Sequence, residues 1–216
     1  MPMRSPSSRR IPSSTFPSIA RSLARCVGRF PKTTPPKEGT RPTTDRVRES
    51  MMSAVESARG GLEGAVVLDA FAGSGALGLE ALSRGARCAH FFERSGEALR
   101  ALCANVRSLG LDARRARLHR ADVLKDPPVW ASEPFDLVFL DPPYALPASC
   151  ALGVPRALAE RGALAADAIV VYEHAASTCA DADEAVDASG LALARRKKYG
   201  DTVVDVLRPA APDDAD

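Results

Sequence analysis

The stretch Leu68-Asp-Ala-Phe-Ala-Gly-Ser-Gly-Ala-Leu-Gly78 decides the fold of this chain. It continues an apolar run that begins at Ala65 and it opens a helical segment, so we predict a strand, a tight turn and a helix in succession. The turn contains the pattern Gly-x-Gly-x-x-Gly from Gly73 to Gly78, in the context that nucleotide binding requires. Glycines let a ligand approach the backbone, and the helix N-terminus offers free amides to an anionic group.

Strand-like and helical segments alternate outward from this turn. We predict strands over residues 65–71, 88–93, 115–122, 135–140 and 168–174, and helices over 43–58, 76–84, 95–109 and 149–161. Such alternation is typical of right-handed crossovers and a parallel, doubly wound sheet. Two last segments, 191–199 and 202–207, are separated by only two residues, which favours an antiparallel hairpin. The predicted fold class is α/β, with a mostly parallel seven-stranded sheet that ends in an antiparallel hairpin.

Composition is typical of one globular domain and excludes a membrane span. The chain has 216 residues, of which 45% are apolar and 26% charged, and no apolar run reaches the roughly 18 residues that cross a bilayer. Five cysteines are scattered singly, which predicts neither a disulfide framework nor a zinc site. We therefore expect a reducing, cytoplasmic location and no metal.

Positive charge is concentrated in residues 1–37, which hold eight basic and no acidic residues. We expect a disordered basic leader over 1–37, a folded domain over 38–208 and an acidic tail over 209–216. A transit peptide or a basic arm that contacts phosphates are the alternatives for the leader.

Acidic side chains beside the glycine-rich turn narrow the choice of cofactor. Glu93 ends the next strand, where a carboxylate accepts hydrogen bonds from ribose hydroxyls. NAD and S-adenosylmethionine both carry that ribose, but Asp69 would repel a pyrophosphate and suits the ammonium of a methionine. Asp122, at the end of the third strand, is a candidate for the adenine amino group or an ordinary loop acid. The predicted residues of the S-adenosylmethionine site are Asp69, Ala72, Gly73, Ser74, Gly75, Glu93, Asp122 and Val123.

The turn Asp141-Pro142-Pro143-Tyr144 directly follows the apolar strand 135–140, at the sheet edge where ligands bind in α/β folds. Its prolines fix the backbone, so Asp141 and the Pro142 carbonyl form a rigid pair of acceptors beside the flat ring of Tyr144. This arrangement suits a planar base with an exocyclic amine, such as adenine N6 or guanine N2. Hydrogen bonds to both amine protons would direct the nitrogen lone pair at a methyl carbon. We therefore predict that Asp141, Pro142, Pro143 and Tyr144 form the catalytic turn.

Four stretches of the chain resemble the RsmD family of 16S rRNA (guanine-N2)-methyltransferases: 41–49, 68–85, 139–144 and 199–202. The resemblance extends over residues 37–208 and implies a Rossmann-like class I methyltransferase fold, S-adenosylmethionine as cofactor and one guanine of 16S rRNA in the small ribosomal subunit as substrate. It also implies that Gly73, Gly75 and Glu93 hold the cofactor and that the catalytic turn holds a flipped base. Residues 1–31 do not resemble the basic segment with which family members usually open, which indicates a replaced arm or a misassigned start.

Two basic groups are candidates for RNA contacts. Arg46 and Arg48 would contact RNA phosphates or be merely solvated, and Arg195–Lys198 would bind phosphates or protect a sheet edge. We expect packing or surface roles for His90, His119 and His174, and none is evident for Asn105.

Three other functions remain open from the residues alone: an adenine-N6 DNA methyltransferase, an NAD-dependent oxidoreductase and a non-catalytic RNA-binding assembly factor. The first lacks residues for a DNA-recognition domain, and the second lacks an evident hydride-transfer site. We expect a monomer.

Overall fold

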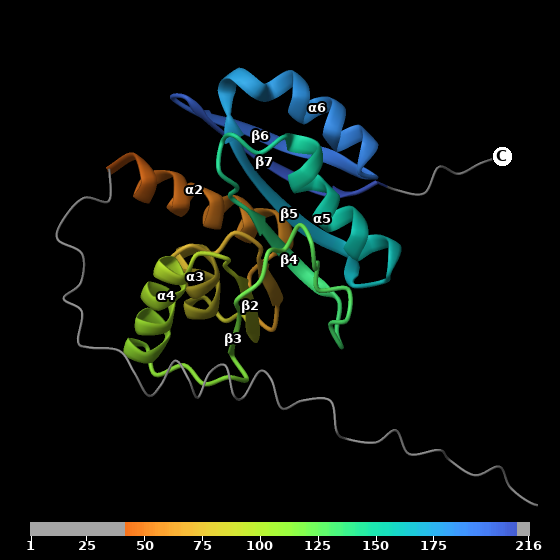
Figure 1. Cartoon of the computed structure of the whole chain (residues 1–216). Coiled ribbons are helices and arrows are strands. Elements are labelled where there is room, and N and C mark those ends of the chain that lie inside the picture. The colour runs from red at the N-terminus through yellow and green to blue at the C-terminus, as the bar shows by residue number, and fades with distance from the viewer. Residues whose placement is uncertain (1–41, 211–216) are drawn as a thin grey trace, which may run out of the picture. The chain divides into compact units, whose positions relative to one another are not determined.

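A seven-stranded sheet forms the centre of the protein, in the order β3-β2-β1-β4-β5-β7-β6 (Figure 1). The structure is a computed structural model that describes residues 42–210, and their side chains from Val47 onward. The strands are β1 (Val66–Asp69), β2 (Cys88–Phe92), β3 (Ala116–His119), β4 (Phe135–Leu140), β5 (Leu164–Ala175), β6 (Leu191–Tyr199) and β7 (Thr202–Pro209). The first five pair in parallel, and β7 pairs antiparallel with both β5 and β6. The predicted fold class is confirmed.

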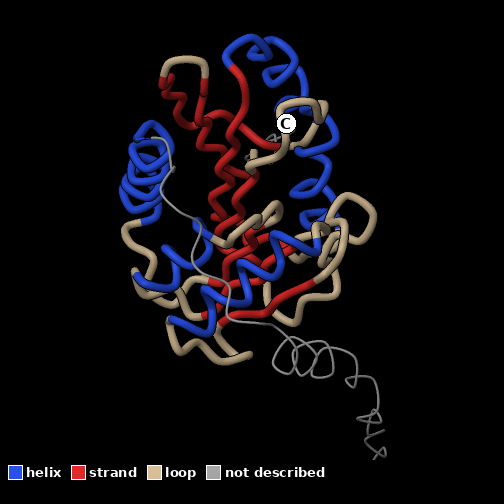
Figure 2. The backbone as a smooth tube through the Cα atoms, turned by 60° about the vertical axis from the view of Figure 1, so that its left-hand side comes forward, coloured by secondary structure: helices blue, strands red, loops and turns tan. Residues whose placement is uncertain are grey.

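Helices cover both faces of this sheet (Figures 1 and 2). They are α2 (Pro42–Arg59), α3 (Ala76–Ser83), α4 (Gly96–Ser108), α5 (Ala148–Glu160) and α6 (Cys179–Ala188), with a short 3-10 turn η1 (Ala176–Thr178) before α6. One face carries α2, which contacts β5 and β7, and α3, which contacts β1 and β2; α5 and α6 pack on the other face. Because both faces are covered, β1 and β4 are almost entirely buried, which explains their continuous apolar sequence.

Three elements differ from the sequence prediction. Helix α6 was not predicted, because its buried residues Ala182, Ala185 and Val186 are small and give a weak helical pattern. Strand β5 begins at Leu164, earlier than expected. Strand β3 ends at His119, so the prediction that Asp122 lies at a strand end is wrong: it lies in the following turn.

The expected leader (1–37) and residues 211–216 of the expected tail lie outside the described residues, and β7 continues to Pro209. No helix among residues 42–210 is both long and apolar enough to cross a membrane.

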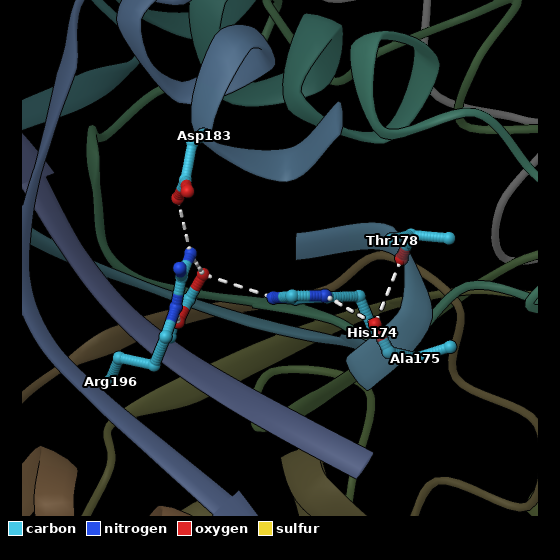
Figure 3. A network of polar contacts seen from close by, with 6 residues as sticks. His174, Ala175, Thr178, Asp183 and Arg196 are labelled. Carbon is cyan, nitrogen blue, oxygen red and sulfur yellow. Dashed lines mark hydrogen bonds and ion pairs between the residues drawn. The ribbon is translucent and has the colours of Figure 1, made fainter. Parts of the chain in front are cut away.

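A buried polar network joins β5 to the carboxyl-terminal hairpin and to α6 (Figure 3). The carboxylate of Asp205 on β7 accepts two hydrogen bonds of 2.7 Å from Arg196 on β6, which also donates to Asp183 on α6. His174 Nε2 lies 3.1 Å from Asp205 Oδ2. Burial alone would raise the pKa of Asp205, but the hydrogen bonds from Arg196 and His174 lower it below its ordinary value. The network fixes the end of β5, beside the functional site.

Candidate active site

The glycine-rich turn and the catalytic turn meet at the carboxyl ends of β1 and β4. Asp69 pairs in register with Phe139, and the next residue, Ala70, donates its backbone N–H to the Phe139 carbonyl at 3.1 Å. The strand order runs outward in opposite directions from this pair of strands, and α/β sheets bind ligands at such a switch point. The two motifs, about 70 residues apart in the chain, therefore form one site.

The glycines of the first turn have different neighbours. Gly75 has φ +86°, and a Cβ atom there would lie 2.3 Å from Leu102 Cδ1 on α4. Gly73 has φ +54° but meets no atom within 4 Å, which leaves space for a ligand. Asn105 Nδ2 donates to the Ser74 carbonyl at 3.0 Å. This gives Asn105 a role in holding the turn, which a single polar residue on a helix did not reveal.

Glu93 connects the end of β2 to the glycine-rich turn. Its Oε2 accepts the backbone N–H of Gly73 at 2.8 Å, and its Oε1 accepts the N–H of Ser95 at 2.5 Å. The carboxylate therefore lies directly against the turn, and each of its oxygens keeps a second lone pair for a ligand hydroxyl.

Asp69 lies behind the turn. Its side chain is buried, and Oδ2 accepts the backbone N–H of Gly78 in the first turn of α3 at 2.9 Å. Burial raises the pKa of Asp69 to about 7; the Gly78 hydrogen bond opposes this rise, and the charges of Asp141 and Glu93 add to it. The buried carboxyl group of Asp69 thus links β1 to the first turn of α3.

A cavity of about 570 Å³ opens between the two turns. Of the predicted site residues, it is lined by Glu93, Asp122, Val123 and all four residues of the catalytic turn, Asp141, Pro142, Pro143 and Tyr144. It is completed mainly by apolar side chains, among them Phe71, Phe92, Leu124 and Leu146. Asp69, Ala72, Gly73, Ser74 and Gly75 are not among the lining residues. The cavity has the size and largely apolar wall of a small-molecule site.

Asp122 shapes one wall of this cavity. Its Oδ1 accepts the backbone N–H of Leu124 at 3.2 Å, and Oδ2 lies 3.9 Å from Arg94 Nη1. Asp122 therefore stabilises its own loop, as the simpler sequence interpretation held, and also faces the cavity.

The catalytic turn presents its polar groups to the cavity. Asp141 is exposed to solvent, but the protein groups packed around its carboxyl group partly desolvate it, and this raises the pKa of Asp141 above its ordinary value. The side chain of Tyr144 is 59% exposed, and its hydroxyl lies 3.1 Å from Thr202 Oγ1 at the tip of the β6–β7 hairpin. The aromatic ring is thus held at its far end while its face stays open to solvent.

The basic segment Arg195–Lys198 divides between the two faces of β6. Arg196 joins the buried network, whereas Lys197 donates to Ser50 on α2 at 3.3 Å and lies 5.0 Å from the centre of the Tyr199 ring. Arg48, also on α2, is half-buried. The side chain of Arg46 lies outside the described part of the structure.

His90 and His119 pack against each other below the cavity. Their rings stack at 5.4 Å, and burial lowers their pKa values to about 3 and about 4, so both are neutral. His174 is also buried, but it contacts Asp205 in the polar network described above. Among the side chains that the structure describes, residues 47–210, no cluster of three or more His, Cys, Asp or Glu could hold a metal ion.

Comparison with known proteins identifies the family. The family model described as "Conserved hypothetical protein 95" matches residues 27–208. The chain therefore belongs to this family, the RsmD family. A Bacillus subtilis member, YlbH, named provisionally as an rRNA methyltransferase, is 34% identical over 78% of this chain and 88% of its own length. The Haemophilus influenzae Ribosomal RNA small subunit methyltransferase D is 39% identical over 50% of this chain and 54% of its own length.

Solved structures share the fold of this protein. An Escherichia coli protein described provisionally as the methyltransferase yhhF is 30% identical, covers 82% of this chain and 92% of its own, and gives a TM-score of 0.64. The match to the family model, over residues 27–208, includes both turns described above. The resemblance stated from the sequence is therefore confirmed.

Proposed function

We propose that this protein transfers a methyl group from S-adenosyl-L-methionine to the exocyclic N2 of a guanine in 16S rRNA of the small ribosomal subunit. The observation that carries the proposal is the single cavity lined on one side by Glu93 and Asp122 and on the other by the turn Asp141–Tyr144. One side suits an adenosine and the other suits an amine on a planar base. Membership of the RsmD family and the names of the relatives support the rRNA substrate.

The cofactor fits the residues that are present. Glu93 would accept the ribose hydroxyls, and the apolar wall would cover the adenine, with Asp122 and Val123 at its edge. The open space at Gly73 would let the methionine part pass close to the backbone. Asp69 does not line the cavity, so we assign it to holding the turn, with its charge acting on the ammonium from behind the backbone. When bound, the cofactor supplies a sulfonium methyl group that leaves readily.

The catalytic turn would activate the guanine by position. Asp141 and the Pro142 carbonyl accept the two N2 protons, which favours a pyramidal nitrogen with its lone pair directed into the cavity. Tyr144 stacks on the base, with its hydroxyl held by Thr202. After the transfer, N2 releases a proton to Asp141 or to water, and the raised pKa of Asp141 suits it as an acceptor.

Neither the adenine-N6 DNA reaction nor the NAD-dependent reaction gains support, because the curated relatives are named as rRNA methyltransferases. The same reasoning supports the small ribosomal subunit as partner and the cytoplasm as location. We further propose that the protein acts as a monomer without a metal ion, which light scattering and metal analysis of the purified protein test.

The experiment is methylation of small ribosomal subunits from a strain that lacks this activity, with radiolabelled S-adenosylmethionine. We expect label in N2-methylguanosine after digestion of the RNA, and none with the Asp141→Ala variant, which must still bind the cofactor product by calorimetry. Label in N6-methyladenosine, or no label despite cofactor binding, would contradict the proposal.

A further inference from the structure

We propose that Glu173 accepts the N1–H of the target guanine and thereby selects guanine over adenine. The inference rests on the proposed methylation of guanine N2. It adds a residue that determines specificity and that lies on β5, whereas the catalytic turn follows β4. Glu173 lies on β5 and was not among the candidates from the sequence.

The donors of guanine outnumber the acceptors of the catalytic turn. The Watson–Crick edge of guanine presents three N–H donors next to one another: two on N2 and one on N1. Asp141 and the Pro142 carbonyl take the two on N2. A buried donor without a partner costs free energy, so a site that encloses this edge needs a third acceptor beside the first two.

Glu173 lies on the strand next to the catalytic turn and lines the second cavity beside that turn, not the first cavity. Strands β4 and β5 pair in parallel with Leu140 opposite Tyr172, so the next residues, Asp141 and Glu173, lie side by side. Both belong to the same edge of the sheet. A second cavity, of about 240 Å³, runs along the other side of the catalytic turn and is lined by Pro142–Ala148 and by Tyr172–Ala175, including Glu173.

The surroundings of Glu173 leave its carboxylate available to a ligand. It is half-buried, and among the described side chains, those of residues 47–210, no lysine or arginine forms an ion pair with it. Burial and the charge of Asp141 raise the pKa of Glu173 to about 7, opposed by a hydrogen bond from Tyr144 and by His174. A carboxylate in this setting is stabilised when a bound N–H donor compensates for its burial.

Adenine does not complete this arrangement. Its exocyclic amine could occupy the acceptors of Asp141 and Pro142, but its N1 carries a lone pair in place of the N–H. When Glu173 is ionised, at a pH above its pKa of about 7, two acceptors would then face each other without a proton between them. Sites built to hydrogen-bond a donor reject an analogue that lacks it, because the protein group is left unpaired.

The test uses 2-aminopurine, which keeps the 2-amino group of guanine but has an unprotonated N1. Small subunits are reconstituted with guanine or 2-aminopurine at the guanine that the methylation experiment maps, and kcat/KM is measured for each. We expect the wild-type protein to prefer guanine by at least about 10-fold. Glu173→Ala should lower kcat/KM on guanine by about 100-fold and abolish the preference. Glu173→Gln should shift the preference toward 2-aminopurine, because its amide can donate to N1.

Controls separate specificity from folding. Asp167→Asn removes another acid from β5, one that is exposed, and should leave both rates unchanged within about twofold. Calorimetry with the cofactor product should give unchanged affinity for the Glu173 variants. An equal loss on both bases, or an unchanged preference in Glu173→Gln, would overturn the inference. Absence of N2-methylguanosine from the wild-type reaction would instead contradict the proposed function itself.

Discussion

In the glycine-rich turn, Gly75 is needed for packing and Gly73 leaves space for a ligand. Substituting each by alanine can separate these two roles. Gly75→Ala places a Cβ 2.3 Å from Leu102 Cδ1 and forces alanine to φ +86°. We expect the free energy of unfolding, measured by urea denaturation, to fall by about 2–4 kcal/mol.

The matched control is Gly73→Ala, where φ is also positive but the surrounding space is open. It should lower the free energy of unfolding by about 1–2 kcal/mol. The loss in the free energy of cofactor binding, measured by calorimetry, should be larger than this. Equal stability losses in the two variants would contradict this distinction.

Asp69 gives the protein a predictable pH response. Its pKa is raised from 3.8 to about 7, so the folded state holds this proton more tightly than the unfolded state. Its favourable contribution to stability is therefore complete below pH 3.8 and is lost as the pH rises through 7. Asp69→Asn keeps an oxygen for the Gly78 N–H and does not ionise.

We expect the stability of the Asn variant, relative to the wild type, to increase between pH 5 and pH 8 in urea denaturation. Stability curves that stay parallel over this range would show that the Asp69 pKa is not raised.

At the level of residues, sequence spacing brings out the candidate residues that stand next to strands or in motifs, whereas candidates that depend on how strands pair become visible only in the structure. Glu93 and Asp141 directly follow strands and Gly73 lies in the turn after β1, at the edge where parallel sheets gather their functional groups. Glu173 also lies in a strand, but only the pairing of β4 with β5 places it beside Asp141. Asn105 contacts Ser74 through the approach of α4 to the turn, which local sequence does not encode.

Among the elements, the β6–β7 hairpin supports the catalytic turn through one hydrogen bond. Thr202→Val removes one partner of the Tyr144 hydroxyl, which also contacts Glu173, with little change of shape. We expect methyl transfer to slow about 3- to 10-fold, with cofactor affinity unchanged.

A double-mutant cycle tests that this effect acts through the hydroxyl. In a Tyr144→Phe background, Thr202→Val should have no further effect on the rate. Additive losses would mean that Thr202 acts on the reaction by another route.

Helices and strands with a strong apolar pattern were predicted from the sequence, and those with a weak pattern were not. Strand β4 and the hairpin strand β6 were predicted with the observed limits, because one is a continuous apolar run and the other ends at a two-residue turn. Helix α6 was missed because an Asp- and Ala-rich segment buries few large side chains. Its helical structure is stabilised by tertiary contacts with α5 and β6 rather than by its own pattern.

For the whole molecule, the network around Asp205 joins three strands and a helix. Asp205 is fully buried and depends on Arg196 for its neutralising charge. Arg196→Met removes the arginine from this buried carboxylate and leaves it only the contact with His174, and we expect a loss of about 3–5 kcal/mol in the free energy of unfolding. The pKa of Asp205 is lowered, so its favourable contribution holds above pH 3.8 and disappears as the pH falls through the lowered pKa.

Arg156→Ala is the matched control, because Arg156 pairs with Glu160 on the exposed surface of α5. It should cost about 0.5 kcal/mol or less. Similar losses for the two arginine variants in urea denaturation would contradict a structural role for the buried network.

The sheet order also sets the sequence in which the nascent protein can acquire its activity. Strand β7 follows β6 in the chain, yet it lies between β5 and β6. Until β7 is synthesised, β5 has an unpaired edge, and neither Thr202 nor Asp205 is in place. The catalytic turn at Asp141 therefore leaves the ribosome well before the residues that support it. A chain that ends before β7 would contain the turn but not Thr202, which holds the Tyr144 hydroxyl.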